Sequence, residues 1–469
     1  MMQCQQVSLY NSGFSMTLKT LHLTNAWHET SGGIATFYRA LLRAANGRGH
    51  FMTLVVPGQS AQVEKVGDYG KIVYLKSPSA PFNPRYRMIN PNQFLPAGSV
   101  LQRLLVSERP DLIEICDKYS LPYLGSLLRR GLLRGVDFRP VVVGLSCERL
   151  DDNFRSYVGR LPLARSFCSA YMKYVYFPSF DHHLANSPYT AEELRPASQG
   201  QLVPRSVWIR AMGVDTQHLS PLRRSPEGRR RILEIVNGRD DTVVLLYVGR
   251  LVPEKNLPLL FRLLVRLVRR RHRDYRLLVA GEGIERRRWE EFCRRRAQTR
   301  ATFLGHVSDQ QQLADLLANA DLFIHPNPRE PFGIALLEAM ASGLPLVAPD
   351  AGGLTSYANR TNAWTTRPDV ESFADAVEEV LADEGARLGR LKNALRTAER
   401  NRWENVSPGF LDLYADLHRA ATDPAHKLPP PAFSSTPARS LRRAWYQGFS
   451  RAAEGIFRIA SDCVGHRET

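Results

Sequence analysis

The feature that constrains the fold most is a repeated alternation of short β-rich runs with longer helical runs. Apolar stretches of strand length follow one another along the chain, and segments of helical periodicity separate them. Neighbouring parallel strands need a crossover connection, which is usually a helix. The alternation therefore predicts an α/β fold built from parallel sheets with crossover helices.

The alternation occurs in two sets. The first set predicts strands at residues 20–24, 51–56, 71–75, 111–116, 141–145 and 183–186. The second set predicts strands at residues 242–248, 276–280, 301–304, 322–325 and 346–348. The chain has 469 residues, of which 43% are hydrophobic, so it has enough apolar material for two cores. We predict two Rossmann-like, doubly wound domains that join near residues 205–215.

Changes in composition give the domain boundaries. We expect an N-terminal extension at residues 1–16, a first domain at 17–205, a second domain at 206–400 and a closing helix at 401–421. Prolines at 429–431 mark a linker within a final segment, 422–469. Its last part places Leu441, Trp445 and Phe449 on one helical face and most arginines elsewhere. Such a helix can lie on an anionic membrane surface or dock on the protein itself, and the sequence leaves both open.

Cysteine usage and the lack of targeting segments indicate the compartment. The six cysteines contain no CxxC pair, and no histidines accompany them at metal-binding spacing. A disulfide framework or a structural zinc site is therefore disfavoured. The sequence has no secretory signal pattern and no apolar run long enough to span a membrane. We expect a cytoplasmic protein, with the tail as a contact to the inner face of the cytoplasmic membrane.

The net charge of +17 indicates polyanionic partners. Much of the charge lies in arginine clusters such as 269–271, 286–288 and 294–296, which are typical of solvated helix faces. No aromatic residues alternate with these arginines, as a base-stacking platform requires, so nucleic acid is disfavoured. Phosphate-bearing small molecules and anionic lipid remain.

The segment Asn327 to Glu338 carries the sharpest chemical signal. It follows a predicted strand, bends at prolines and opens a helix at Phe332 and Gly333. First-turn amides and the positive end of a helix form an anion site. Glu330 precedes that turn and Glu338 follows it by about two turns, so the two carboxylates can reach opposite ends of a ligand whose phosphates lie between them.

Two further loops fit a phosphate ligand. Residues Tyr247 to Asn256 place Arg250 and Lys255 at the end of a predicted strand, where sheet ligands bind. Together these cations can neutralise a diphosphate, including charge that develops on it as a leaving group. Gly32 and Gly33 lie between the first strand and the first helix, where glycines allow amides to approach a phosphate. A plain tight turn explains the Gly-Gly pair equally well.

The ordered set of motifs resembles the retaining glycosyltransferases of family 4, which have the GT-B fold. The resemblance rests on the Gly-Gly loop, Gly-Arg-Leu at 249–251 with Glu-Lys-Asn at 254–256, Gly-Glu-Gly at 281–283, and Glu-Pro-Phe-Gly at 330–333 followed by Glu338. It covers roughly residues 18–420. It implies two Rossmann-like domains that face each other across a cleft, and a closing helix with Trp403 and Tyr414 that returns to the first domain.

The resemblance also implies roles for individual residues. Arg250 and Lys255 would hold the donor diphosphate, Glu330 the hydroxyls of the transferred sugar, and Glu338 the nucleotide ribose. Arg250, Lys255 and Glu330 are thus the expected catalytic residues. Further donor contacts are expected from Gly33, His306, Val307, Phe332, Gly333 and Ile334. Such enzymes would need no metal and no other cofactor, and the resemblance implies that the phosphate leaves and the acceptor attacks on the same face of the sugar.

The acceptor side departs from the family pattern at one position. Many relatives have a histidine after the strand that corresponds to 141–145, whereas here Cys147 precedes Glu148, Arg149 and Asp151. We expect these four residues, with Gly32, to line the acceptor side. A thiol is a weak hydrogen-bond partner, so contact with a sugar hydroxyl is weakened or Glu148 compensates for it. Cys147 as a small buried apolar residue is an equally good interpretation.

The leading hypothesis is transfer of a hexose from GDP-mannose or a UDP-hexose to a lipid or glycan acceptor. The Glu-Arg-Leu-Asp segment at 148–151 slightly favours relatives that use GDP-mannose. Two alternatives stay open at this point. One is a nucleotide-sugar 2-epimerase of the same fold, and the other is a weakly active scaffold that binds nucleotide sugar and membrane. A dinucleotide dehydrogenase is disfavoured, since no GxGxxG follows the first strand.

Overall fold

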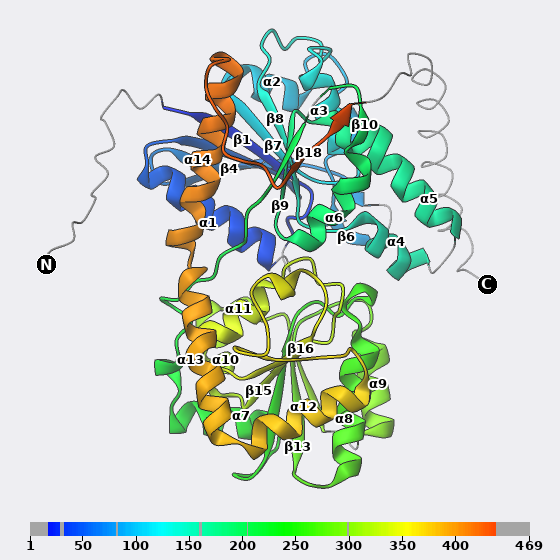
Figure 1. Cartoon of the computed structure of the whole chain (residues 1–469), viewed down its shortest axis with the longest axis vertical. Helices are drawn as coiled ribbons and strands as arrows, with labels where there is room; N and C mark the ends of the chain where they lie inside the picture. Colours follow the sequence, from blue (N-terminus) through cyan, green and yellow to red (C-terminus); the bar gives the residue numbers. More distant parts are fainter. Residues whose placement is uncertain are drawn as a thin grey trace, which may run out of the picture.

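The chain forms two α/β domains, one above the other in Figure 1. A computed structural model describes residues 17–28, 32–80, 83–158, 162–203, 205–297 and 300–437. The predicted N-terminal extension and the basic amphipathic tail therefore lie outside the described residues, as does Ser31 of the Gly-Gly loop. Within the described residues, no helix is long and apolar enough to cross a bilayer.

The first domain contains a nine-stranded sheet among the described residues. Its central strands are parallel, and only the two edge pairs, β18 with β11 and β3 with β4, are antiparallel. In spatial order the strands are β18 (Phe433–Ser434), β11 (Ser206–Ile209), β9 (His182–Ala185), β8 (Val141–Ser146), β7 (Leu112–Cys116), β1 (Lys19–Thr24), β2 (Phe51–Gly58), β4 (Gly70–Lys76) and β3 (Gln62–Val66). The helices are α1 (Gly33–Gly47), α2 (Val100–Glu108), α3 (Leu121–Arg129), α4 (Leu150–Val158), α5 (Pro162–Tyr171) and α6 (Pro188–Ala197).

The second domain contains a six-stranded sheet among the described residues, and all of its pairings are parallel. In spatial order the strands are β14 (Ala301–Gly305), β13 (Tyr275–Ala280), β12 (Val243–Val248), β15 (Leu322–Ile324), β16 (Leu346–Pro349) and β17 (Trp364–Thr366). The helices are α7 (Pro226–Ile235), α8 (Leu257–Arg270), α9 (Arg286–Arg296), α10 (Gln310–Asn319), α11 (Ile334–Ala341), α12 (Val370–Ala382) and α13 (Glu384–Arg400). The predicted strands of both domains are present. Strands β3, β11 and β18 of the first sheet and β17 of the second were not predicted from the sequence, and the predicted pair of doubly wound domains is confirmed.

The expected boundary at residues 205 and 206 lies too early. Strand β11 pairs with β9 in the first sheet, so the chain leaves the first domain only after Ile209. The boundary residues are buried in that sheet rather than exposed as a linker, and Val207 and Trp208 are almost inaccessible to solvent.

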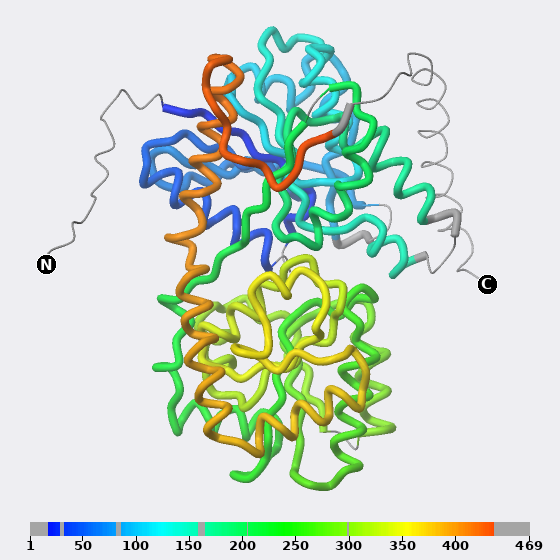
Figure 2. The backbone as a smooth tube through the Cα atoms, viewed as in Figure 1, coloured from blue at the N-terminus to red at the C-terminus, as the bar shows by residue number. Residues whose placement is uncertain are grey.

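Part of the expected linker also belongs to the first domain. The chain returns along β11, where Trp208 Nε1 donates to the Pro429 carbonyl at 3.1 Å and Ala432 N donates to the Val207 carbonyl at 2.8 Å. Figure 2 shows this segment crossing the upper domain. It covers a sheet edge that would otherwise present unpaired backbone groups, so the proline-rich segment is a structural strap up to residue 437.

The closing helix α14 (Trp403–Thr422) runs from the second domain back to the first (Figure 1). Its Tyr414 hydroxyl donates to the buried Glu114 carboxylate, which also accepts from Tyr38 at 2.9 Å and contacts His22 at 3.1 Å. These four side chains are buried, so they satisfy one another's polar groups inside the core. The predicted crossover to the first domain is confirmed.

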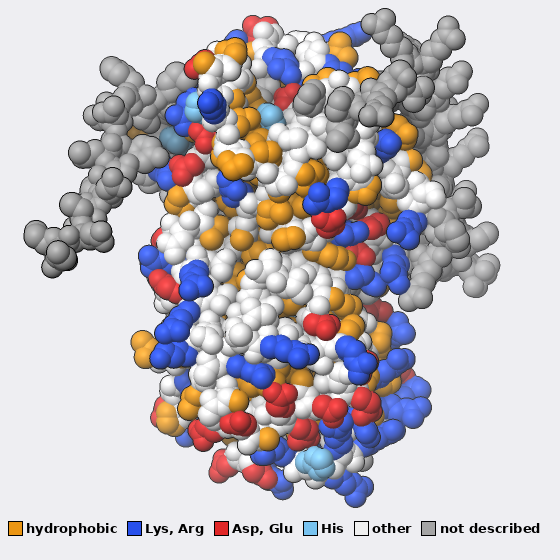
Figure 3. Space-filling model, viewed as in Figure 1, with side chains coloured by type: hydrophobic (Ala, Val, Ile, Leu, Met, Phe, Trp, Pro, Cys, Tyr) orange, Lys and Arg blue, Asp and Glu red, His pale blue; other side chains and the backbone are white. Residues whose placement is uncertain are grey.

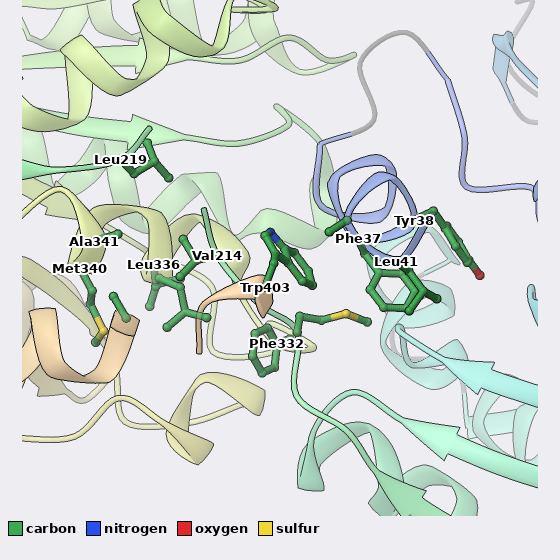
Figure 4. Packing of buried hydrophobic residues seen from close by; sticks show 14 of the residues in the cluster. Phe37, Tyr38, Leu41, Val214, Leu219, Phe332, Leu336, Met340, Ala341 and Trp403 are labelled. Atoms are coloured by element: carbon green, nitrogen blue, oxygen red, sulfur yellow. The ribbon is translucent and has the colours of Figure 1, made fainter. Parts of the chain in front are cut away.

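One hydrophobic cluster extends through both domains at their junction. It contains Phe37 of α1, Val214 of the connection, Phe332 and Leu336 near α11, and Trp403 at the start of α14. Figure 4 shows Trp403 between the α11 residues and Phe37, and the Phe37 and Trp403 ring centroids are 6.2 Å apart. The core thus continues from the donor-side helix to the first helix of the other domain.

The arginine clusters lie on helix surfaces, as predicted. Figure 3 shows basic side chains gathered at the lower right, over α8 and α9. On α9, Arg286 forms an ion pair of 2.7 Å with Glu290, and Arg295 forms one with Glu291. Both arginine–glutamate pairs are spaced four residues apart, which is the ordinary pattern of a solvated helix.

Candidate functional site

The predicted donor residues collect at one edge of the second sheet. Arg250 follows β12, His306 follows β14, and Glu330 lies in the loop after β15. Because these strands run parallel in one sheet, the loops that follow them emerge at the same carboxyl edge. This is the edge where open α/β sheets bind ligands.

Lys255 and Glu330 form the centre of the site. The Lys255 Nζ lies 3.0 Å from Glu330 Oε1 and 2.8 Å from Oε2, although the two residues are far apart in the sequence. Glu330 is 7% exposed. The structure therefore brings together a carboxylate and a cation that lie in separate loops of the sequence, and their contacts with a sugar and a phosphate stay predictions.

Two more side chains hold Glu330, and neither was predicted. Asn327 Nδ2 donates to Glu330 Oε2 at 3.1 Å, and His325 Nε2 lies 3.4 Å from the same oxygen. Burial acts to raise the pKa of Glu330, but the charge of Lys255 and the His325 ring outweigh it and lower the pKa below its ordinary value. Glu330 is thus an anion at neutral pH, able to accept two hydroxyl donors.

Arg250 is half-buried and forms an ion pair of 3.1 Å with Glu254. Burial acts to lower the pKa of Arg250, but Glu254 and Tyr86 more than compensate, so the pKa is raised and the charge is permanent. His28, which follows β1 in the first domain, lies close enough for burial and then the charges of Arg250 and His306 to lower its pKa to about 4. The sequence analysis missed His28, whose only signal was its place after the first strand.

The predicted helix N-terminus is present. Gly333 is the residue before α11 and has φ +91°, and a Cβ there would lie 2.8 Å from Leu336 Cδ1. The amides of Ile334 and Ala335 are in the first helical turn, where no helix carbonyl accepts from them. Tyr357, which was not predicted, donates its hydroxyl to the Phe332 carbonyl at 3.0 Å or the Gly333 carbonyl at 2.6 Å. The loop carbonyls are thereby held by Tyr357.

The first domain meets this helix end. A Cβ on Gly33 would lie 3.0 Å from Ile334 Cδ1, so the start of α1 faces the start of α11 across the junction. Gly32 is the N-cap residue of α1, and both glycines are exposed. Two helix N-termini, one from each domain, therefore face the same space. That arrangement favours an anionic ligand there.

Glu338 lies on α11 at the other end of the expected ligand. It is half-buried, and burial together with the nearby Asp215 raises its pKa to about 7. Asp215 follows Val214, which forms an isolated parallel β-bridge with Arg402 in the connection between the domains. His306 is exposed, and Val307 is half-buried against the hydrophobic cluster that joins the domains. The contacts of these residues with a nucleotide stay predictions.

The acceptor-side residues Cys147 and Glu148 are half-buried at the end of β8. Burial, followed by hydrogen bonding with Cys116, raises the pKa of the Cys147 thiol. Burial also raises the pKa of Glu148, whose Oε2 accepts from Asn153 Nδ2 at 2.8 Å. Cys147 packs against the same junction cluster as Val307, which fits a small core residue at the edge of the site.

Arg149 and Asp151 do not project into open space as separate ligand groups. Arg149 Nη2 lies 2.6 Å from Asp151 Oδ2, and Arg149 Nη1 donates to the Tyr189 carbonyl at 3.1 Å. The sequence analysis also missed a buried pair beneath this loop, in which Lys118 Nζ donates to Glu193 and to the Glu148 carbonyl. Glu193 Oε1 accepts from Leu150 N at 2.7 Å and Asp151 N at 3.1 Å. The acceptor loop is therefore shaped by ions that are already satisfied.

Within the described part of the chain, no group of three or more His, Cys, Asp or Glu side chains is arranged to hold a metal ion. The expectation that the reaction uses neither metal nor other cofactor stays a prediction.

Comparison with known families accounts for both domains. Residues 31–218 match the profile described as Glycosyltransferase Family 4, and residues 229–402 match the one described as Glycosyl transferases group 1. The two matches cover most of the first and second domains and contain the candidate site residues described above, apart from His28.

Relatives match along most of the chain. A GDP-mannose-dependent alpha-(1-6)-phosphatidylinositol dimannoside mannosyltransferase of Mycobacterium tuberculosis is 28% identical over 402 residues, which cover 84% of this chain and 95% of that enzyme. A GDP-mannose-dependent alpha-mannosyltransferase of the same species is 33% identical over 262 residues, covering 55% of this chain and 61% of that enzyme.

Solved structures share the fold. Sucrose-phosphate synthase from Thermosynechococcus elongatus has a TM-score of 0.68 at 21% identity, covering 86% of this chain and 100% of that one. HepE of Anabaena, in complex with UDP and glucose, has a TM-score of 0.61 at 16% identity, covering 85% of this chain and 99% of that one. At these identities the likeness shows the two-domain architecture.

Proposed function

Since this chain belongs to the family 4 glycosyltransferases and has their GT-B fold, we propose that it transfers a hexose, with retention, from a nucleotide-diphosphate sugar to a lipid or glycan acceptor. The observation that carries the proposal is the buried Glu330 carboxylate, which Lys255 holds at 2.8 Å beside the first turn of α11. A carboxylate kept ionised there can accept sugar hydroxyls, while the adjacent amides and cations bind phosphate.

The donor diphosphate would exchange places with carboxylates that already neutralise the cations. In the structure, Lys255 is paired with Glu330 and Arg250 with Glu254. A diphosphate brings stronger charge and oxygens that can accept from both cations, and the Glu330 oxygens are then free to accept from sugar hydroxyls. Arg250 and Lys255 would stabilise the charge that grows on the phosphate as the bond from the sugar anomeric carbon to the phosphate oxygen breaks.

The transfer step needs no protein nucleophile in this scheme. The bond from the anomeric carbon to the acceptor oxygen forms on the face that the phosphate leaves, and the acceptor proton passes to the departing phosphate oxygen. Glu330 is engaged by Lys255, Asn327 and the nearby His325, which suits a hydroxyl-binding anion better than a free nucleophile. The chain would thus contribute orientation and electrostatic stabilisation.

We propose GDP-mannose as the donor to test first. The support is the printed function of the two relatives described above, both of which are GDP-mannose-dependent mannosyltransferases. A thermal-shift panel with GDP, UDP, ADP and their sugars tests this choice, because a ligand that binds only the folded protein raises its apparent stability. A larger shift with UDP or ADP than with GDP would overturn the donor assignment.

Incubation with labelled nucleotide sugars, with and without a lipid extract, tests the reaction class. A transferase releases nucleotide and labels the acceptor only when the extract is present. A 2-epimerase, by contrast, converts the sugar without any acceptor. Acceptor-independent conversion as the main product would contradict the proposal.

We also propose that the tail after residue 437 brings the enzyme to an anionic membrane that carries the acceptor lipid. The support is the basic amphipathic pattern of residues 441–460 and the strap, which attaches the preceding residues to the first domain. Flotation with vesicles that contain anionic lipid should fall when residues 438–469 are removed. The deletion should begin at 438, because the β19 residues Thr436–Pro437 pair with β10 (Gln199–Gln201). Unchanged flotation would exclude the anchor.

A further inference from the structure

Side chains of the first domain contact the loop of residues 327–333 at the residues on either side of Glu330. We call this set of contacts the grip. On one side, the Ser187 hydroxyl donates to the Pro331 carbonyl at 2.5 Å. On the other side, Arg329 Nε lies 3.4 Å from Asp152 Oδ1 and Arg329 Nη2 donates to Ser156 Oγ at 3.4 Å. Ser187, Asp152 and Ser156 belong to the first domain, whereas Arg329 and Pro331 belong to the second.

Within the second domain, Gly353 also contacts the loop that carries Glu330. Gly353 N donates to the Glu330 carbonyl at 2.7 Å. A Cβ on Gly353 would lie 1.8 Å from the Pro331 carbonyl oxygen and 2.7 Å from Ser187 Oγ, so only glycine fits there. The backbone that carries Glu330 is therefore enclosed between Gly353 and Ser187.

The groups of the first domain that make this grip are fixed by their own hydrogen bonds. Ser187 is the N-cap of α6, where its Oγ accepts from Thr190 N at 3.2 Å, and it is 1% exposed. Asp152 lies in the first turn of α4, and its Oδ2 accepts from the Tyr189 hydroxyl and lies 3.5 Å from Arg149 Nε. The N-cap of α6 and the first turn of α4 thus present preorganised partners to one loop of the other domain.

We propose that Ser187 and Asp152 are positioning residues that set Glu330 on Lys255 only while the two domains are in contact. Glu330 lies directly between Arg329 and Pro331, so loss of either contact removes one restraint on its backbone, while the hydrogen bond from Gly353 N stays. Helix α4 starts just after the acceptor loop of Cys147 to Arg149, so the element that holds Arg329 also carries the acceptor side. The donor geometry is thereby tied to the domain that binds the acceptor. The inference rests on the proposed role of Glu330.

The test compares S187A and D152N with two matched controls. S225A removes an N-cap from α7, where Ser225 Oγ accepts from Gly228 N at 3.0 Å, without touching the other domain. E371Q removes a carboxylate that lies 2.8 Å from Arg266, on a surface of the second domain. S187T and D152E keep the hydroxyl and the carboxylate, and they serve as conservative rescues.

The first measurement is hydrogen exchange of peptides that cover residues 327–333 in the protein without added ligand. We expect exchange to rise several-fold in S187A and D152N and to stay at the wild-type rate in both controls. The second is steady-state kinetics with GDP-mannose and lipid extract. We expect kcat to fall about tenfold, with the KM for GDP-mannose within about twofold of wild type, and S187T to recover most of the loss.

The outcomes separate this inference from the proposed function. Unchanged exchange at 327–333 in both variants overturns the grip. Faster exchange with unchanged kcat shows that the contact does not position Glu330, and also overturns the inference. If wild type has no activity with GDP-mannose but exchange rises only in S187A and D152N, the donor assignment fails while the grip stands.

Discussion

The two sides of the candidate site pair their charged groups in different ways. On the donor side, the cations Arg250 and Lys255 are each paired with one carboxylate beside the open edge of the second sheet. On the acceptor side, Lys118 is 1% exposed and donates to Glu193 and the Glu148 carbonyl deep under the loop. One set of ions can change partners, and the other is part of the core.

Because of this difference, the two lysine–glutamate pairs, Lys255–Glu330 and Lys118–Glu193, can have different roles. A pair at the edge of a site can release its cation to a phosphate, because the incoming oxygens replace the carboxylate. A buried pair cannot be opened without leaving an unpaired charge away from water, so it can only fix the shape of what covers it. If the proposed function is correct, the ions of the donor side therefore take part in the reaction, whereas those of the acceptor side only fix the shape of its loop. The following predictions test that contrast, in order of decreasing effect.

Replacement of Lys118 should have the largest effect, which we expect on the free energy of unfolding. K118M leaves Glu193 buried with only two backbone donors, at 2.7 and 3.1 Å. Breaking a buried pair on one side costs about 3–5 kcal/mol of unfolding free energy. Urea unfolding should show this loss, and K118M/E193Q should recover part of it. The matched control is K71M, whose pair with Glu108 at 2.8 Å is partly exposed and should contribute about 0–1 kcal/mol.

Replacement of Lys255 should cost activity. In K255M the leaving phosphate loses a cation, and Glu330 loses the partner that holds it 2.8 Å away. We expect kcat/KM to fall at least ~100-fold, which corresponds to ~2.7 kcal/mol of transition-state stabilisation. The folded fraction, followed by circular dichroism, should stay at the wild-type level.

K71M serves again as the control for Lys255, since it removes a lysine–glutamate pair of the same length outside the candidate site. If K255M retained activity within about tenfold of wild type, the donor-site assignment would be wrong.

Glu338 should make nucleotide affinity depend on pH. Its pKa of about 7 means that it is partly protonated in the free protein near neutral pH. Ribose hydroxyls donate to the ionised form, so binding favours deprotonation, and affinity should weaken as the pH falls below 7. The expected loss is at most about tenfold per pH unit for one linked proton. Calorimetry of GDP binding from pH 5.5 to 8.5 measures it, and E338Q should bind more weakly with this dependence removed.

The sequence was informative wherever a local pattern decides the structure. Strand β12 and helix α11 lie within a residue or two of their predicted positions, because apolar runs and the Pro-Phe-Gly turn act over a few residues. The positions of Glu330, Lys255 and Gly333 relative to these elements were predictable for the same reason, since each lies in a loop directly after or before a predicted element.

The remaining features depend on contacts between distant residues. Lys118 and Glu193 are 75 positions apart, and Ser187 and Pro331 are 144 apart, so no local spacing relates them. The strap was interpreted as a linker because proline and serine usually mark one, yet its two-residue strand β18 pairs with the β11 edge. Local composition carries no information about which sheet edge is left to cover.

Loss of the Tyr357 hydroxyl should have a smaller effect. Y357F removes the donor that holds the Phe332 and Gly333 carbonyls, while the ring contact with Phe332, with centroids 5.0 Å apart, stays. A hydrogen bond of this kind contributes about 1 kcal/mol. We expect a loss of that size in unfolding free energy and a several-fold fall in kcat. A fall as large as that of K255M would mean that loop shape, rather than charge, dominates the donor side.

Substitution of Cys147 should have the smallest effect and provides the sharpest test of the contrast. Burial raises the pKa of its thiol, so at neutral pH it is neither a thiolate nor a strong hydrogen-bond partner. C147S and C147A should therefore change kcat/KM by less than about threefold. Iodoacetamide should modify Cys147 slowly at pH 7, as followed by peptide mass spectrometry. A tenfold loss in both variants would show that the acceptor side contributes chemistry as well as shape, because neither change disturbs the Lys118–Glu193 pair on which the loop rests.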